Sequence, residues 1–245
     1  MTMKMSDFYI GESAVPGGFG EVYVLKAPPR ADSSGGGENF LGAVLERLVT
    51  DGDRFPVPRF FTDPPRVVYD ALANMTTIVK PIEDVQTLAG FSSTIDRQSG
   101  LKVSLGFDEV PNIPLKLGVK LDMSRVLSVT ATFTDPVVEY IRLGRLQRLF
   151  TFLDGDADRL WKHLDREYIC DTVVLVSKYA VTVQQEGDIS AELEASLEAA
   201  VAGVKGGLTI AYSRTDKNSF SLTIDAASPY LYALGVRRWT EIDPN

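Results

Sequence analysis

With 245 residues, of which 44% are hydrophobic and 24% are charged, the chain is long enough to bury roughly 70–75% of its unfolded surface. Its net charge of −8 at pH 7 argues against a general nucleic-acid groove, because phosphate binding needs a basic surface, and its single cysteine excludes an internal disulfide bond. Residues 1–15 lack the apolar stretch of a signal peptide, and no segment reaches the ~18 continuous apolar residues of a membrane helix, so we expect a cytoplasmic protein.

Hydrophobic spacing and turn residues divide the first eighty residues into short segments. In chain order, we predict a strand pair over 5–27 with its turn at Pro16-Gly17-Gly18, a loop over 27–37, an amphipathic helix over 40–49, an extended proline-rich segment over 54–66, and a strand pair formed by 67–72 and 76–79.

The middle of the chain shows the clearest alternation of apolar and polar residues. Residues 101–107 and 113–123 each alternate, and a loop with two prolines joins them. Residues 127–133 alternate in the same way. A period of two indicates strands with one buried face, so three strands are predicted here.

After Asp135-Pro136 the spacing of apolar residues along the sequence changes to that of a helix. Aspartate is a good N-cap and proline suits the first helical position, so we predict a helix that begins here and continues to residue 153. Asp154-Gly155-Asp156 interrupts it, and a shorter helix follows. Residues 169–183 are rich in Val, Leu, Thr and Tyr, which predicts one long strand.

The last sixty residues are predicted to form a helix, a hairpin and a strand. The helix covers 188–203 and is capped by Asp188 or Ser190; the hairpin has arms at 208–212 and 220–224; the last strand covers 230–236. Strands outnumber helices and their connections are short. We therefore predict one domain of the α+β class, with a twisted, mostly antiparallel sheet and helices packed on it.

The residues that could take part in enzyme chemistry do not form a complete catalytic or metal-binding motif. Gly17–Gly20 with Lys26 resembles a kinase glycine-rich loop, but the catalytic Asp, the metal-binding Asn and the magnesium Asp are missing in context. His163 has no second His and no Cys pair near it, so a zinc site is not expected. Cys170 is predicted to be a small core residue. No catalytic residue, metal or cofactor is predicted.

Three stretches in this order resemble the pore-forming N-terminal domain of gasdermins. Val126–Pro136 is similar to the family's strand that enters an Asp/Pro-started helix, Tyr168–Val176 to its strand after the second helix, and Leu222–Val236 to its closing strands. The resemblance extends from Leu115 to Arg238, about half of the chain, and depends on the order of elements and on the hydrophobic pattern.

The resemblance implies a membrane pore-forming protein of regulated, lytic cell death, with a gasdermin-like fold, that oligomerises in anionic membranes. Only Trp239–Asn245 follow the stretch that carries the resemblance, and Met1–Gly20 contain no cysteine for a lipid anchor. In both respects the chain is similar to the fungal heterotypic gasdermins, allelic cell-death proteins without an inhibitory domain to cleave. Activation by a protein partner, assembly with itself or with a related chain, and movement from the cytoplasm to the plasma membrane follow from the resemblance. No nucleic-acid partner is expected.

A pore of this kind needs new paired strands, because unpaired backbone in lipid costs several kcal/mol per group, and each strand needs ~9–11 alternating residues. Two hairpins are candidates: 101–107 with 113–123, and 179–185 with 204–213. The apolar positions assigned to the membrane hairpin are Leu101, Val103, Leu105, Leu115, Leu117, Val119 and Leu121. The basic residues expected to contact anionic lipid are Arg142, Arg145, Arg148, Lys102, Lys116 and Lys120.

Two alternatives remain open. Ordinary sheets of soluble proteins show the same alternation of apolar and polar residues, so a soluble α+β binding or scaffold domain without membrane activity is the alternative from another class. A nucleotide-binding enzyme that uses residues 17–26 is the weaker one.

Overall fold

The computed structural model describes residues 9–13, 21–25, 40–50, 53–58, 67–75, 78, 80–97, 101, 107–108, 110, 113, 117–152 and 168–242. The described strands are β1 (Tyr9–Ser13), β2 (Glu21–Leu25), β3 (Val44–Thr50), β4 (Asp53–Pro58), β5 (Asp84–Thr87), β6 (Ser92–Asp96), β7 (Phe107–Asp108), β8 (Leu121–Asp122), β9 (Val126–Thr134), β10 (Val137–Tyr140), β11 (Tyr168–Gln185), β12 (Leu208–Asp216) and β13 (Ser219–Arg238). The described helices are α1 (Val67–Asn74), the short 3₁₀ helix η2 (Met123–Arg125), α2 (Leu143–Phe152), α4 (Ala191–Ala202) and α5 (Trp239–Ile242).

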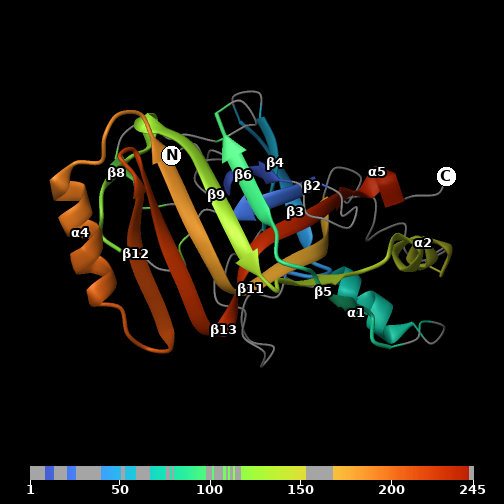
Figure 1. Ribbon diagram of the computed structural model, residues 1–245. Coiled ribbons are helices and arrows are strands. Elements are labelled where there is room, and N and C mark those ends of the chain that lie inside the picture. Colours follow the sequence, from blue (N-terminus) through green and yellow to red (C-terminus); the bar gives the residue numbers. More distant parts are fainter. Residues whose placement is uncertain are drawn as a thin grey trace.

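Two long antiparallel strands, β11 and β13, run through the centre of the molecule (Figure 1). Eleven of the described strands join in one twisted sheet around them, and every pairing is antiparallel. The predicted mixture of helices and an antiparallel sheet is therefore confirmed, including the long strand β11, the hairpin of β12 and β13, strand β9 and helix α4. The prediction of one domain stays a prediction.

An irregularity at Ser177 divides the sheet into two halves. The register of β11 with β13 shifts between Val176 and Lys178. On the other edge, β11 pairs with β10 before this point and with β9 after it. One extra residue in a strand reverses which residues face which side, so Val176 and Tyr179 both face the same hydrophobic cluster. We call β6, β9, β12, residues 178–185 of β11 and residues 219–225 of β13 the far half.

Two hydrophobic clusters pack against the sheet. The first core cluster covers one face of the far half, where it includes Phe133, Val181 and Leu222, and continues into the other half through Val138 and Val174. The second core cluster lies in the other half and includes residues of β2, β11 and β13 together with Val68 and Leu72 of α1 and Leu146 of α2. Helix α4 therefore lies at one end of the molecule and α1, α2 and α5 at the other (Figure 1).

Two predicted elements of the first half of the chain differ in the structure. Residues 44–50 form strand β3 and not a helix, because their backbone pairs with β4 along its length and with β11 at Tyr168 and Ile169. Residues 67–74 form helix α1 and not a strand, since Val68 and Leu72, four residues apart, are both fully buried on one side. Strand β4 confirms the extended conformation predicted from residue 54 onward, as far as Pro58.

The helix predicted to start at Pro136 is also wrong. Residues 137–140 form strand β10, which pairs with β5 on one side and with β11 on the other. Asp135 adopts a left-handed backbone conformation with φ 48°, which aspartate tolerates better than most residues, and it turns the chain between β9 and β10. Hydrogen bonding to two neighbouring strands outweighs the local helix-start signal. The helix begins at Leu143 instead.

Other predicted elements are corrected in extent. The last strand, expected at 230–236, is the continuation of β13, which runs without a break from Ser219 to Arg238. Strands β5 and β6 were not predicted, because β6 buries only Ser93 and Ile95 and β5 leaves Val85 exposed. The strand pair of 5–27 is confirmed as β1 and β2. The turn at Pro16-Gly17-Gly18, the loop over 27–37 and the second helix after residue 156 lie outside the described residues.

The close approach of β11 and β13 gives a testable prediction at Gly235. Gly235 pairs with Thr172, and a Cβ at Gly235 would lie 2.6 Å from the Cβ of Thr172. Because both strands are central, we expect Gly235→Ala to lower the free energy of unfolding by about 1–3 kcal/mol through overpacking. Chemical denaturation measures the change. Gly144→Ala is the matched control, since a Cβ there meets nothing within 4 Å, and an equal loss in both variants would contradict the account.

Candidate functional site

The candidate site is the cover over the apolar face of the far half of the sheet. Two parts of the chain make this cover: residues 117–125, which precede β9, and helix α4 with the residues before it. Both contribute to the first core cluster, through Val119, Leu121 and Met123 from one part and Ile189 and Leu197 from the other. They belong to the two segments that the sequence singled out as candidate membrane hairpins, and the structure places both on the same face of the sheet.

Residues 117–125 keep the predicted alternation but not the predicted strand. Val119, Leu121 and Met123 are buried, whereas Gly118 and Lys120 are exposed. Of the strand predicted over 113–123, only Leu121–Asp122 is a strand, and it pairs with the two residues of β7. The Asp122 carboxylate accepts hydrogen bonds from the backbone and hydroxyl of Ser124 and turns the chain into η2. Apolar contacts therefore hold this segment more than backbone pairing does.

Arg125 joins the two parts of the cover. Its guanidinium donates to the backbone carbonyl of Glu186 through Nε at 3.0 Å and Nη2 at 2.6 Å, and its own carbonyl accepts from the Glu186 amide at 2.7 Å. Gly187 has φ 74°, and a Cβ there would lie 2.8 Å from Nη2 of Arg125. The turn between β11 and α4 is thus shaped around this arginine. We call this contact the Arg125 clasp.

Helix α4 rests on β12 through a small number of contacts. Ser190 caps it by accepting from the Leu193 amide at 3.1 Å, and within the helix only Leu197 is fully buried. Glu194 accepts a hydrogen bond from Arg214 of β12 at 3.0 Å. Beneath the helix, the Tyr212 hydroxyl has no hydrogen-bond partner among the described residues, and its pKa is raised by burial and by the nearby Glu194 carboxylate. The interface of α4 with the sheet therefore contains a buried hydroxyl group without a hydrogen bond among the described residues.

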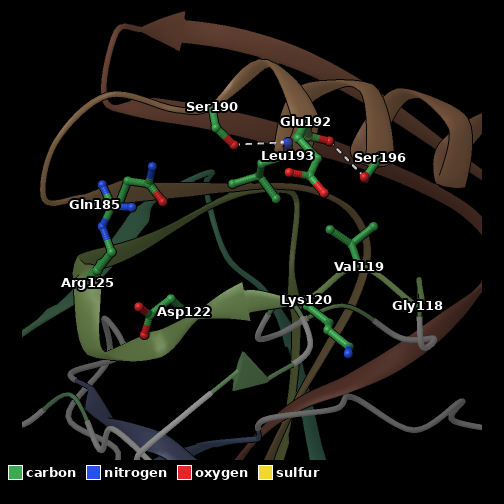
Figure 2. Close-up of a pocket in the computed structure, with 10 residues that line it drawn as sticks. All are labelled: Gly118, Val119, Lys120, Asp122, Arg125, Gln185, Ser190, Glu192, Leu193 and Ser196. Atoms are coloured by element: carbon green, nitrogen blue, oxygen red, sulfur yellow. Dashed lines mark hydrogen bonds between the residues drawn. The ribbon is translucent and has the colours of Figure 1, made fainter.

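A cavity of about 500 Å³ separates the two parts of the cover (Figure 2). Residues of the 117–125 segment face the first two turns of α4 across it. Its charged lining residues have both signs: Lys120 and Arg125 are basic, and Asp122 and Glu192 are acidic. Among the described residues, no group of three His, Cys, Asp or Glu side chains could hold a metal ion.

The structure divides the predicted lipid-binding residues between two places. Arg142 and Arg145 meet on one carboxylate, Asp84, at 2.7 Å and 3.4 Å, and the hydrogen bond to Asp84 raises the pKa of Arg142. Arg145 also donates to the Ile82 carbonyl. Arg148, on the same helix α2, is exposed. Lys120 is exposed and directly precedes β8. Helix α2 and strand β8 lie toward opposite ends of the molecule (Figure 1).

The predicted hairpin residues are buried where the structure describes them. Leu101, Val119 and Leu121 are buried and Leu117 is partly buried, all in the first core cluster. The remaining candidates lie outside the described residues, namely Val103, Leu105, Leu115, Lys102 and Lys116. The glycine-rich loop and His163 also lie outside them. Cys170 is fully buried, as predicted for a core residue. The sequence analysis missed Arg125 and Arg214, because no local pattern distinguishes an arginine whose partner is far along the chain.

Among the described helices, none is both long and apolar enough to cross a membrane. Comparison of the chain with models of protein families and with curated proteins found no match.

Proposed function

We propose that this chain is a gasdermin-like pore-forming protein of regulated cell death. In this proposal the cover leaves the sheet when a protein partner activates the chain, the strands of the far half extend and insert into an anionic membrane, and several copies assemble into a pore. One observation carries the proposal: four long paired strands have one apolar face, and that face is covered by α4 and the 117–125 segment.

Strands β9 and β12 of the far half come close to the length and the pattern that insertion requires. β9 and β12 contain nine residues each, close to the ~9–11 residues that cross a bilayer. Their apolar side chains alternate with small polar ones, as in strands that face lipid on one side and water on the other. Backbone groups of β9, β11, β13 and β12 are already paired with one another, which removes the largest cost of placing a backbone in lipid.

The cover is held by the buried apolar side chains of its two parts and by a few polar contacts. The Arg125 clasp joins the two parts to each other, and the Arg214–Glu194 pair connects α4 to β12; an exposed ion pair such as the second contributes about 0–1 kcal/mol. A partner that binds α4 or residues 117–125 could therefore shift the balance between the covered and the uncovered sheet.

Anionic lipid would be bound through local basic residues, in spite of the net charge of −8. Lys120 is exposed on the cover and Arg148 is exposed on α2, so both are accessible to headgroups. Arg142 remains exposed along its side chain although it contacts Asp84. A basic residue near an anionic surface contributes about 1 kcal/mol, and the proposal places the activated chain at the cytoplasmic side of the plasma membrane.

Dye release from liposomes tests the proposal. Because the activating partner is unidentified, Arg125→Met with Arg214→Met serves as a substitute for activation, and Lys205→Met, at an exposed residue beyond α4, is the control. We expect the double variant to release dye from vesicles rich in anionic lipid, the control to release little, and neither to release dye from purely zwitterionic vesicles. A folded double variant that leaves anionic vesicles sealed would contradict the proposal and favour the soluble binding or scaffold domain.

A further inference from the structure

Two of the four charged residues that line the cavity between the two parts of the cover already have partners within the chain. The Asp122 carboxylate accepts hydrogen bonds from the backbone amide and the hydroxyl of Ser124. The Arg125 guanidinium donates twice to the carbonyl of Glu186. The charges of Asp122 and Arg125 are therefore used to shape the cover itself.

The other two charged residues, Lys120 and Glu192, are left over, one on each wall of the cavity. Lys120 belongs to the 117–125 segment and Glu192 to the first turn of α4. Both residues are exposed, and among the described residues neither the Lys120 ammonium nor the Glu192 carboxylate has an ion-pair or hydrogen-bond partner. The cavity thus offers one positive and one negative group on opposite walls, and the two groups do not pair with each other.

The rest of the lining supplies apolar surface and hydrogen-bonding groups. Val119 from one wall is buried and Leu193 from the other is partly buried, both in the first core cluster. In Figure 2 the side chain of Val119 points toward the helix, and that of Leu193 points toward the 117–125 segment. Gln185 and Ser196 add an amide and a hydroxyl group. The volume of about 500 Å³ lies within the ~300–1,000 Å³ of pockets that hold small molecules.

From this lining we infer that the cavity binds a zwitterion of dipeptide size, with its ammonium group at Glu192, its carboxylate at Lys120 and an aliphatic side chain against Val119 and Leu193. Such a molecule contacts both parts of the cover at once. When either part leaves the sheet, the two walls separate and the site is lost. A ligand that binds only one of two states stabilises that state by mass action, so the bound zwitterion keeps the cover on the sheet.

Only the consequence of this binding rests on the proposed function, in which departure of the cover is the step that leads to a pore. The covered state would be favoured wherever such a zwitterion is abundant, and a fall in its concentration would make activation easier. Binding itself, and the closure of the cover that it causes, can be measured without a membrane.

Calorimetry tests the binding site with the dipeptide alanyl-leucine, its N-acetylated form, which lacks the cation, and its C-terminal amide, which lacks the anion. We expect alanyl-leucine to bind more tightly than either blocked form. Glu192→Gln should weaken binding of alanyl-leucine about three- to tenfold and leave that of the acetylated form unchanged. Lys120→Met should act in the same way on alanyl-leucine and leave the amide form unchanged. Glu198→Gln, on the same helix, and Lys205→Met are the matched controls, since both residues are exposed and neither lines the cavity.

Hydrogen exchange measured by mass spectrometry tests whether the ligand holds the cover. Saturating alanyl-leucine should slow amide exchange in α4 and in residues 117–125 of the unmodified protein, and it should lower dye release by the Arg125→Met/Arg214→Met variant, which retains Lys120 and Glu192. Adding Glu192→Gln should remove most of both effects at the same dipeptide concentration.

Absence of binding, equal binding by all four single variants, or binding that leaves exchange in the cover unchanged would overturn the inference and leave the proposed pore in place. The opposite result separates the two claims as well. If alanyl-leucine binds through Glu192 and Lys120 and protects the cover from exchange, but no folded variant releases dye, the site stands and the proposed function is contradicted.

Discussion

Replacing Arg237 by methionine should lower the free energy of unfolding by about 3–5 kcal/mol at pH 7, because it leaves a buried carboxylate without its partner. Asp171 of β11 is only 2% exposed, and its Oδ2 lies 2.7 Å from Nε of Arg237 on β13. The Thr172 hydroxyl donates to the other oxygen at 3.0 Å. The ion pair joins the two central strands, so its loss affects the whole sheet.

The loss should depend on pH in a defined direction. Burial raises the pKa of Asp171 above its ordinary value of 3.8, and the Arg237 charge opposes this shift. A raised carboxyl pKa means that the folded state holds the proton more tightly, so this group's contribution to stability falls as the pH rises above about 4. Without Arg237 the pKa is higher still. The variant should therefore be closest to the unmodified protein in acid and differ most at neutral pH.

Urea denaturation at neutral pH and near pH 4.5 measures both parts of this prediction. Arg238→Met is the matched control, since Arg238 is half exposed and its carboxylate partner Glu241 is 3.9 Å away. An exposed pair of that kind should change stability by less than about 1 kcal/mol. Equal losses in the two variants, or a loss at Arg237 that does not vary with pH, would contradict the account of the buried pair.

In protein activated by the replacement of Arg125 with methionine and by the loss of the Arg214 guanidinium, linking α4 to β12 should abolish membrane leakage. Glu194 and Arg214 face each other across this interface, so cysteines at both positions can be joined by a bismaleimide linker that contains a reducible disulfide. The crosslink retains the cover on the sheet, and dye release from anionic vesicles should fall to that of vesicles without protein. Reductant cleaves the linker and should restore release.

The control crosslink joins Thr209 and Asp225, both replaced by cysteine. These residues are partners in the hairpin of β12 and β13, which stays paired before and after insertion, so the same linker should leave dye release unchanged. If the Glu194–Arg214 crosslink is verified and leakage persists, α4 does not need to leave the sheet. If both crosslinks abolish leakage, the linker acts by a general stiffening of the hairpin.

Elements with a strong local signal could be predicted from the sequence. β11 is long and rich in β-branched residues, α4 has a cap and an apolar stripe, and β12 and β13 enclose a polar turn. Elements whose type depends on distant partners could not. The Asp135-Pro136 pair carries a helix-start signal, yet Val137 and Val138 find partners in β5 and β11, and no local pattern reports those partners.

The candidate site could be predicted only in part, for the same reason. Alternation identified the apolar side of residues 117–123, and Val119 and Leu121 are buried as expected. The contacts that hold the cover join Arg125 to Glu186, 61 residues away, and Arg214 to Glu194, 20 residues away.

The central claim is that β12 enters the membrane with one face toward lipid and the other toward water. Spin labels on single cysteines at Ala211, Tyr212 and Ser213 test it directly, in a chain in which the buried Cys170 is replaced by alanine and the two arginines Arg125 and Arg214 are replaced by methionine. On anionic vesicles we expect the label at Tyr212 to become accessible to oxygen dissolved in lipid, while labels at Ala211 and Ser213 remain accessible to a water-soluble nickel complex. Three labels that keep their solution accessibilities when the protein is bound to vesicles would contradict the claim.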